Sequence, residues 1–456
     1  MELFEKKITP DYEKQHNWES YAENLSTEYR QCIEEGLDVK AYEELFYCVR
    51  HMEKTDEKRA MADILSRIVL NAKPLSDYEY VEPSDLESIK KCRPSGGFKT
   101  KAPDASSLRE KVAGAWYGRI CGCLLGKTVE GIKTEELDVL LKSSNNYPMH
   151  RYIRRDDVTD EMLETFKYPL ANRCYADKIT CAPADDDTNY TVLYQKVVDD
   201  YGRDFTPYDV SRAWLKDQPI NAYCTAERVA FCNFVKGFTP PESAVYQNPF
   251  REWIGAQIRG DYFGYINPGD PETAADMAWR DASVSHVKNG IYGEMFAAAM
   301  IACAAVSDDV VSIIEGGLSQ IPEKSRLYKA ITNIIQKYKS GASCEEVFAD
   351  IHSRWDEHVG HDWCHTISNA EIVAAALLYG GGDYGKSICL AVQTGFDTDC
   401  NGATVGSVLG MKNGVLSIGK EWTAPINGKL ETAIFGVGTI SIDEAIDKTL
   451  GHISEK

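Results

Sequence analysis

GFDTDCNGATVGSVLG, residues 395–410, joins an acidic cluster to a helix with one bare face. Within it, Gly402, Gly406 and Gly410 recur at every fourth position, so they lie on the same side of a helix. A face without side chains lets a neighbouring segment approach closely. The stretch therefore predicts a tightly packed helix that begins beside Asp397 and Asp399.

Outward from this stretch, the chain from about residue 106 consists of one helical segment after another. We predict helices over Asn189–Asp200, Gly293–Val306 and Asn369–Tyr379, the last ended by three glycines. Thr432–Ser441 is the best candidate for a strand. The predicted fold class is all-α.

A second acidic cluster, Asp185-Asp186-Asp187-Thr188, also stands just before a predicted helix. Like charges this close destabilise a fold unless cations neutralise them. Carboxylates without histidine favour Mg²⁺, Mn²⁺ or Ca²⁺ over zinc. If the two clusters meet, five carboxylates could bridge two divalent ions, and such a site can activate a bound water. The alternative is that each cluster only caps its helix.

Composition restricts the partners and the compartment. Lys and Arg number 50 against 70 Asp and Glu, a formal charge of −20, which disfavours nucleic acid and anionic membranes as partners. The 14 cysteines form no CxxC pair, and MELFEKKITP lacks the apolar core of a signal peptide. We expect a cytoplasmic protein with mostly buried, reduced thiols.

The first hundred residues differ from the rest. Helical segments are predicted over Asn17–Glu35, Asp38–His51 and Glu57–Asn71, followed by a turn-rich stretch that could be a linker. We therefore expect a helical N-terminal extension at residues 1–105 and the main domain at residues 106–456. Nothing in the extension suggests chemistry.

Four blocks, in this order, resemble the ADP-ribosylglycohydrolase family, which includes the dinitrogenase-reductase-activating glycohydrolases and the ADP-ribosylhydrolases. They are GAWYGRICGCLLGKTVE (114–130), ADDDTNY (184–190), RGDYFGY with DASVSH (259–265 and 281–286) and GFDTDCNGATVG (395–406). The resemblance covers residues 106 to 440 and leaves the extension outside.

The resemblance implies an all-α orthogonal bundle with two Mg²⁺ ions in a central cleft, with Mn²⁺ as the alternative ion. It implies hydrolysis of the glycosidic bond between ADP-ribose and an acceptor. The substrate would be an ADP-ribosylated protein or a small ADP-ribosyl or ribosyl conjugate. The oligomeric state and the acceptor stay open.

By the same matching, Asp186, Asp187, Asp397 and Asp399 are the metal-binding aspartates. Asp185 stands where many relatives have threonine and adds a fifth carboxylate. Cys400 stands where a hydroxyl residue is common, and a thiol is a poor Mg²⁺ ligand. Either a water fills that ligand position or the second ion is held more weakly.

Glu130 is the candidate carboxylate that orients or deprotonates water, with Asp186 beside it in the catalytic set. A solvated glutamate at a helix end is the alternative for Glu130. Ser283 and His286 match substrate contacts in the family. A helix cap and a buried core histidine are the respective alternatives.

Two further segments are candidates for substrate contact. Arg259–Gly269 contains Gly260 and Tyr265, and such glycines and aromatic rings can bind diphosphate and stack on adenine. A plain turn between helices is the alternative there. His358, His361, Cys364 and His365 form the best zinc-like pattern, but Gly360 and Trp363 interrupt it, which favours packing, with His365 lining the cleft.

Two other functions stay open at this stage. One is an N-glycosidase acting on a small nucleoside or nucleotide conjugate, since diol-binding metals would serve it equally. The other is a non-catalytic ADP-ribose-binding relative, because a fold can be retained after its catalytic activity is lost.

Overall fold

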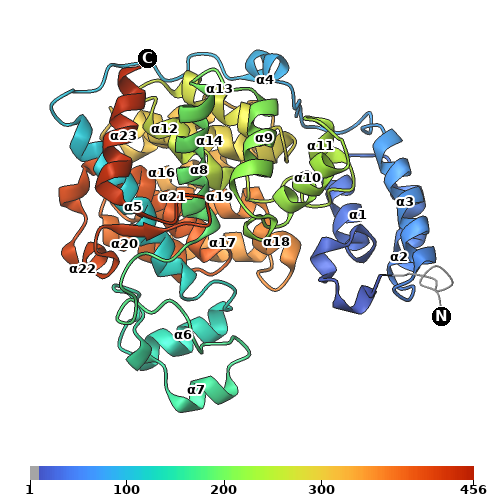
Figure 1. Cartoon of the computed structure of the whole chain (residues 1–456), viewed down its shortest axis with the longest axis horizontal. Coiled ribbons are helices and arrows are strands. Elements are labelled where there is room, and N and C mark those ends of the chain that lie inside the picture. Colours follow the sequence, from blue (N-terminus) through green and yellow to red (C-terminus); the bar gives the residue numbers. More distant parts are fainter. Residues whose placement is uncertain (1–9, 456) are drawn as a thin grey trace.

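The computed structural model describes residues 10–455 of the 456-residue chain, so residues 1–9 of the predicted extension lie outside it. Its helices build an all-α bundle, as predicted (Figure 1). The α-helices are α1 (Leu25–Glu34), α2 (Glu43–Arg50), α3 (Asp56–Asn71), α4 (Leu86–Cys92), α5 (Leu108–Lys127), α6 (Thr134–Ser143), α7 (Asp160–Thr165), α8 (Asp186–Tyr201), α9 (Pro207–Asp217), α10 (Ala226–Val235), α11 (Glu242–Val245), α12 (Asp261–Tyr265), α13 (Pro271–Ala282), α14 (Lys288–Ala304), α15 (Val310–Leu318), α16 (Arg326–Lys339), α17 (Cys344–Arg354), α18 (Gly360–Cys364), α19 (Thr366–Tyr379), α20 (Tyr384–Gln393), α21 (Thr398–Asn413), α22 (Lys420–Thr423) and α23 (Ile442–Ser454).

Short 3-10 helices connect these elements. They are η2 (Tyr12–Lys14), η3 (Asn17–Glu19), η4 (Tyr21–Glu23), η5 (Lys40–Tyr42), η6 (Arg155–Asp157), η7 (Ile220–Ala222), η8 (Gln257–Arg259), η9 (Val415–Ser417) and η10 (Ala424–Ile426). The predicted helix over Asn17–Glu35 is divided into η3, η4 and α1, because the Asn24 side chain donates to the carbonyl oxygens of Asn17 and Ser20.

One small sheet is present among residues 10–455. Strands β1 (Lys429–Glu431) and β2 (Thr439–Ser441) pair antiparallel, with Leu430 opposite Ile440. The strand predicted over Thr432–Ser441 is therefore too long. Gly436 and Gly438 have φ values of +77° and +67°, so the chain turns before β2 begins.

Helices α5 and α21 pack together along facing rows of glycine. A Cβ atom on Gly406 would lie 2.1 Å from the carbonyl oxygen of Gly118, and one on Gly402 would lie 2.4 Å from that of Gly122. The predicted close neighbour of the bare face is thus α5. At one end of the contact, a Cβ on Gly126 would lie 2.2 Å from the backbone of Thr398, so the C-terminus of α5 meets the N-terminus of α21.

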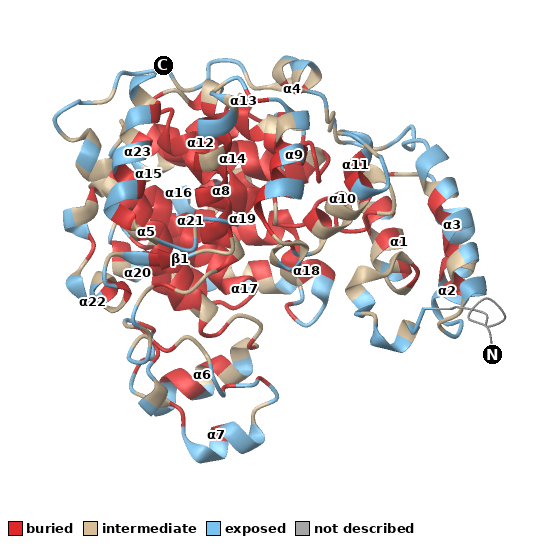
Figure 2. Cartoon of the chain, viewed as in Figure 1, coloured by how far each residue is buried: buried red, intermediate tan, exposed pale blue. Residues whose placement is uncertain are grey.

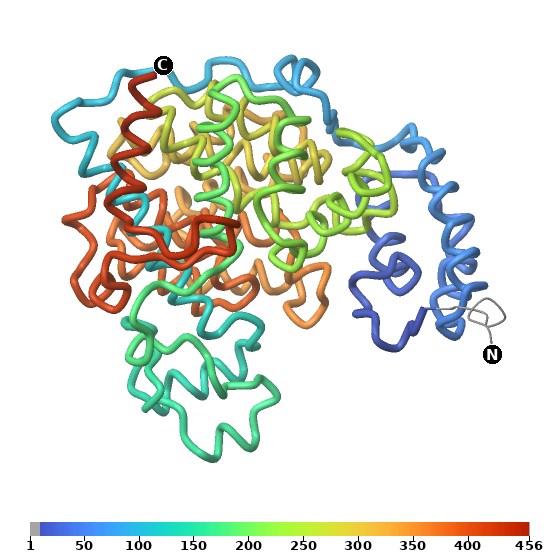
Figure 3. The backbone as a smooth tube through the Cα atoms, viewed as in Figure 1, coloured from blue at the N-terminus to red at the C-terminus, as the bar shows by residue number. Residues whose placement is uncertain are grey.

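The core surrounds this helix pair. Figure 2 shows α8, α14, α19 and α21 largely buried, whereas α6 and α7 project from the body with exposed faces. The chain path in Figure 3 places α1–α3 at one end of the long axis and α23 toward the other. No helix among residues 10–455 combines the length and the apolar character that a bilayer span requires.

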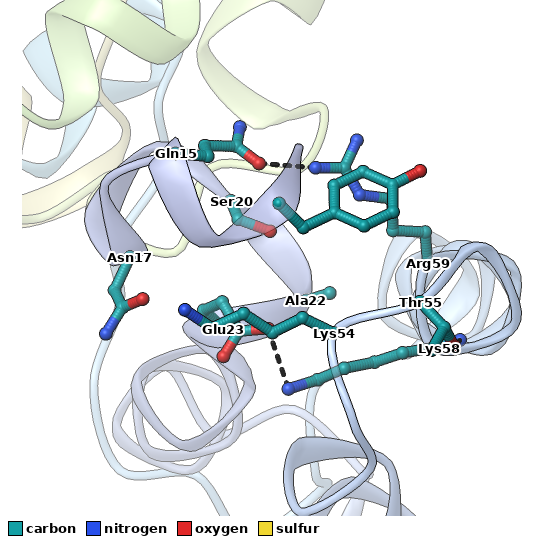
Figure 4. A pocket seen from close by; sticks show the side chains of 10 residues that line it. Gln15, Asn17, Ser20, Ala22, Glu23, Lys54, Thr55, Lys58 and Arg59 are labelled. Carbon is teal, nitrogen blue, oxygen red and sulfur yellow. Dashed lines mark hydrogen bonds and ion pairs between the residues drawn. The ribbon is translucent and has the colours of Figure 1, made fainter. Parts of the chain in front are cut away.

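The N-terminal extension has a small core of its own, formed by Ala22, Leu25, Phe46, Val49, Ala62 and Leu65. Beside it, buried Lys58 forms an ion pair with Glu23 at 2.7 Å, and Arg59 lies over the Tyr12 ring at 3.9 Å (Figure 4). These side chains line a small pocket between η4 and α3 and fill most of it. The pocket is therefore explained by packing within the extension.

Buried charges attach the extension to the main body. Arg251 pairs with Glu28 at 2.7 Å and with Glu35 at 2.6 Å, both on or next to α1. Gln31 donates to Glu252 at 2.6 Å. Farther along, Ile89 of α4 belongs to the main core, so packing against the main body begins before residue 105. The boundary at residue 105 stays a prediction.

Candidate functional site

The two acidic clusters, more than two hundred residues apart in the chain, meet at the N-termini of α8 and α21. Asp187, Asp399 and Cys400 offer ligand atoms that all lie within 4.8 Å of one another. A second group of the same kind consists of Cys123, Asp185 and Asp187. Figure 1 shows α5, α8 and α21 together in the middle of the body. The glycine contact between α5 and α21 therefore sets the geometry of this centre.

Helix capping accounts for only part of the acidic clusters. Asp185 does cap α8, since its carboxylate accepts from the backbone N–H of Asp187 at 3.0 Å. Asp397, the N-cap residue of α21, makes no such bond. One oxygen of Asp187 and one of Asp399 are buried without a hydrogen-bond partner. Buried carboxylate oxygens of this kind need a cation or a bound water.

The loop before α21, which positions Asp397, is strained at Phe396. Gly395 has a φ of +77°, and the buried Phe396 has a φ of +58°, which is unfavourable for a phenylalanine. Asn369 supports the loop, because its side-chain oxygen accepts from the Asp397 N–H at 3.2 Å and from Asn401 at 2.8 Å. Backbone strain of this kind is often found at functional sites, where it fixes the orientation of a side chain.

Two cations missed by the sequence analysis support the carboxylates. Lys127, in the last turn of α5, pairs with Asp185 at 2.6 Å. Arg119, fully buried in α5, pairs with Asp187 at 3.0 Å and with Asp261 at 2.8 Å. Both cations lie in the glycine-rich block at residues 114–130. A local sequence pattern cannot identify ion-pair partners that are so distant in the chain.

The remaining negative charge is not neutralised by the protein. Burial and mutual repulsion raise the pKa of Asp186, Asp187 and Asp399, and burial raises that of Asp397. Burial also opposes ionisation of Asp185, but Lys127 outweighs it and lowers that pKa. Carboxylates that repel one another in a buried place, with free oxygens, are the donor set that divalent cations require. Apart from Cys400, the residues present fit the metal centre that the resemblance implies.

Glu130 lies in the turn that follows α5, within the field of the same cluster. Burial, with Asp397 and Asp185 nearby, raises its pKa to about 7, against the opposing effect of Lys127 and Arg173. A carboxylate with a pKa near neutrality can exchange a proton with water in either direction. This environment differs from that of a solvated glutamate at a helix end.

We expect metal binding to weaken as the pH falls below 7, because protons and cations compete for the same raised-pKa carboxylates. For each proton that the metal must displace, the metal affinity falls about tenfold for every unit by which the pH decreases. Calorimetric titration of Mg²⁺ or Mn²⁺ at pH 8 and pH 6, in buffers of different ionisation enthalpy, would measure both the affinity and the protons released. An affinity independent of pH would contradict this electrostatic picture.

Gly260 and Tyr265 lie in the interior rather than on an open loop. Gly260 lies between η8 and α12, and Tyr265 is the last residue of α12. A Cβ on Gly260 would lie 2.7 Å from the carbonyl oxygen of Glu294 in α14. The Tyr265 hydroxyl is bonded to Ser407 at 2.7 Å and donates to the Ala115 carbonyl at 3.1 Å. The geometry favours a supporting role for this segment, which also carries Asp261, and substrate contact by either residue stays a prediction.

Ser283 and His286 lie at the C-terminal end of α13, beside a buried ion-pair network. Arg259 pairs with Asp281 at 2.7 Å and with Glu227 at 2.6 Å, and it donates to the Ser285 hydroxyl at 3.1 Å. That hydroxyl is bonded to Nδ1 of His286 at 2.8 Å. Burial and the Arg259 charge lower the pKa of His286, so it is neutral at pH 7. Its role in substrate binding stays a prediction.

His361 and His365 contact the N-terminal extension. Nε2 of His361 lies 3.0 Å from the Glu34 carboxylate, and Nε2 of His365 lies 3.5 Å from it. Nδ1 of His361 accepts from the Trp253 indole, and Nδ1 of His365 accepts from the backbone N–H of Ile367. Both rings therefore carry their proton on Nε2, directed at Glu34. A metal bound at Nε2 would need that proton on Nδ1, so this arrangement favours packing over zinc.

Replacing Glu34 by alanine is expected to destabilise the protein by about 2 kcal/mol, since the buried N–H of His361 loses its acceptor and Arg30 loses its charged partner. Burial opposes its charge, but His361, His365 and Arg30 together lower the pKa of Glu34 to about 2. That value is below the pKa of an unfolded glutamate, so the stabilisation is present above about pH 4.3 and is lost as the pH falls toward 2.

Urea unfolding at pH 7 and at pH 3 would measure this effect. The matched control is Glu44→Ala, at an exposed position in the first turn of α2. Equal unfolding midpoints for the two variants at pH 7 would show that Glu34 does not hold the extension in place.

The bundle and its paired acidic motifs define an all-α protein with a carboxylate-rich centre. The family model for ADP-ribosylglycohydrolases matches residues 104–449. The chain belongs to the ADP-ribosylglycohydrolase family, whose members are hydrolases, and it is an enzyme of this kind. The structural prediction of an ADP-ribosylglycohydrolase fold is confirmed.

A solved structure, described as an ADP-ribosylglycohydrolase-related protein complex, is similar with 15% sequence identity and a TM-score of 0.47. The similarity covers 77% of this chain and 99% of that one. No curated protein sequence matches the chain.

Proposed function

We propose that this enzyme hydrolyses the glycosidic bond between ADP-ribose and an acceptor at a centre of two divalent ions, Mg²⁺ or Mn²⁺. The observation that carries the proposal is the meeting of Asp187 with Asp399 and Cys400 within 4.8 Å, with unpartnered carboxylate oxygens. Asp185, Asp186, Asp187, Asp397 and Asp399 are the proposed metal ligands. The ions would bind ribose hydroxyls and lower the pKa of a water.

In this proposal, Glu130 accepts the proton of the attacking water. Burial and the neighbouring carboxylates raise its pKa to about 7 in the metal-free site, and bound cations would lower that pKa, so Glu130 would be ionised and able to accept a proton at neutral pH. A carboxylate beside the ribose ring would stabilise the positive charge that develops there as the glycosidic bond breaks. Asp186, at the first position of α8, takes part in holding the reacting sugar. Lys127 and Arg119 hold Asp185 and Asp187 in place.

A small ribosyl conjugate is the second candidate substrate. The observation in its favour is the burial of Gly260 and Tyr265, since the segment expected to bind diphosphate is packed under α14. A substrate without a diphosphate would not need that loop. The metal centre would serve both substrates.

The test is a comparison of turnover. We expect release of free ADP-ribose from an ADP-ribosylated arginine or serine peptide, dependent on added divalent metal and abolished by EDTA. Faster release of base or amine from small ribosides would favour the second candidate. Hydrolysis of neither class, by folded protein that binds metal, would overturn the proposal.

A further inference from the structure

The thiol of Cys400 lies among the carboxylates of the proposed metal centre. Its ligand atom is within 4.8 Å of those of Asp187 and Asp399, and the side chain is buried. It stands in the first turn of α21, whose position is set by the glycine contact with α5. A thiol with purely packing contacts would have apolar neighbours, as buried cysteines usually do. This thiol instead faces charged oxygens.

The neighbouring carboxylates have oxygen atoms that are free to bind a metal ion. One oxygen of Asp187 and one of Asp399 are buried and have no hydrogen-bond partner, and the side chains of both residues are at least 98% buried. Together with the Cys400 sulfur they offer one soft and two hard ligand atoms around one place.

The other thiol of the centre, Cys123, is differently placed. Its group consists of Cys123, Asp185 and Asp187. Both oxygens of Asp185 are already used, one by Lys127 and one by the Asp187 N–H. The Cys123 group therefore has less free donor capacity than the Cys400 group, although the two thiols are both buried in the same centre.

We propose that Cys400 is a metal ligand, so that the position formed with Asp187 and Asp399 takes a thiolate-accepting divalent ion such as Zn²⁺, Co²⁺ or Fe²⁺ in preference to Mg²⁺. The inference rests on the proposed metal centre and replaces Mg²⁺ or Mn²⁺ by a softer ion at one of its two positions. Sulfur ligands select softer ions, and imposed ligand type is how proteins discriminate among divalent metals. On binding, the thiol proton passes to solvent and the sulfur binds as thiolate.

Cobalt titration tests this directly in the full-length, metal-depleted protein. We expect Co²⁺ to produce a thiolate-to-cobalt charge-transfer band in the near ultraviolet. The band should disappear in Cys400→Ser and persist in the matched control Cys123→Ser. Competition by equilibrium dialysis should show Zn²⁺ displacing Mg²⁺, with a preference that falls at least tenfold in Cys400→Ser.

A measurement on unmodified protein removes the dependence on variant folding. X-ray absorption of the Zn²⁺-loaded protein should show a sulfur neighbour at about 2.3 Å. Only oxygen and nitrogen neighbours at about 2.0–2.2 Å, or a cobalt band that persists in Cys400→Ser, would overturn the inference. Mg²⁺ binding would then remain, and the proposed function with it. If no divalent ion bound at all, both would fail.

Discussion

Replacing Asp399 by asparagine is expected to reduce hydrolysis on the order of 1,000-fold or more while the helical bundle stays folded. Asp399 is buried, one of its oxygens has no hydrogen-bond partner, and it lies with Asp187 and Cys400 at the meeting of the two clusters. Asparagine keeps the shape but removes the charge that holds a cation. Asp186→Asn is expected to act in the same direction.

The direction of the change in melting temperature distinguishes loss of a metal ligand from general misfolding of the variant. Burial and repulsion from neighbouring carboxylates raise the pKa of Asp399, so the ionised group destabilises the metal-free fold at pH 7. Asp399→Asn should therefore raise the melting temperature of metal-free protein and lose the further rise that metal produces. The matched control is Asp160→Asn, at an exposed position that begins α7. Full activity in Asp399→Asn would contradict the metal mechanism.

The second large effect is expected from Gly406→Ala, which should destabilise the protein by about 3 kcal/mol or more. The added methyl carbon would lie 2.1 Å from the Gly118 carbonyl oxygen, and backbone on both sides leaves it no space. Helices α5 and α21 would have to separate. Because Glu130 lies in the turn after α5 and Asp399 lies in the first turn of α21, we expect activity to fall with stability.

Helix propensity alone predicts the opposite sign, since alanine is favoured over glycine within a helix by about 0.5–1 kcal/mol. Gly451→Ala in α23 is the matched control, because nothing lies within 4 Å of a Cβ there, and it should stabilise by about that amount. Urea unfolding of the two variants would measure both effects. A stabilised Gly406→Ala would show that the two helices are not in close contact.

Much of this helix pair could be predicted from the chain. The glycines of residues 402–410 indicated a bare face, and Gly114, Gly118, Gly122 and Gly126 repeat with the same spacing in the other block. Spacing shows that each face is bare but not that the two faces meet. That contact depends on the whole bundle.

The acidic motifs were visible in the sequence because their chemistry is local, with several carboxylates in a few residues. The supports of the centre were not. Arg119 reaches Asp187 and Asp261, and Asn369 reaches Asp397, across long separations that leave no periodic pattern. Glu34 likewise meets His361 from the far end of the chain.

The segment at residues 259–269 shows the limit of composition as a guide. Glycine with aromatic residues suggested an open loop, but the same residues suit close packing of a short helix against α14. Gly260 and Gly264 both stand where a Cβ would overlap that helix. Glycine that permits backbone approach to a ligand and glycine that permits approach of a helix look alike in a sequence.

Binding of ADP-ribose, measured by calorimetry with and without divalent metal, tests the central claim most directly. The account predicts binding that requires metal in the wild-type protein and is lost in Asp399→Asn. Equal binding with and without metal, or unchanged binding in Asp399→Asn, would contradict a substrate site organised by the two acidic clusters.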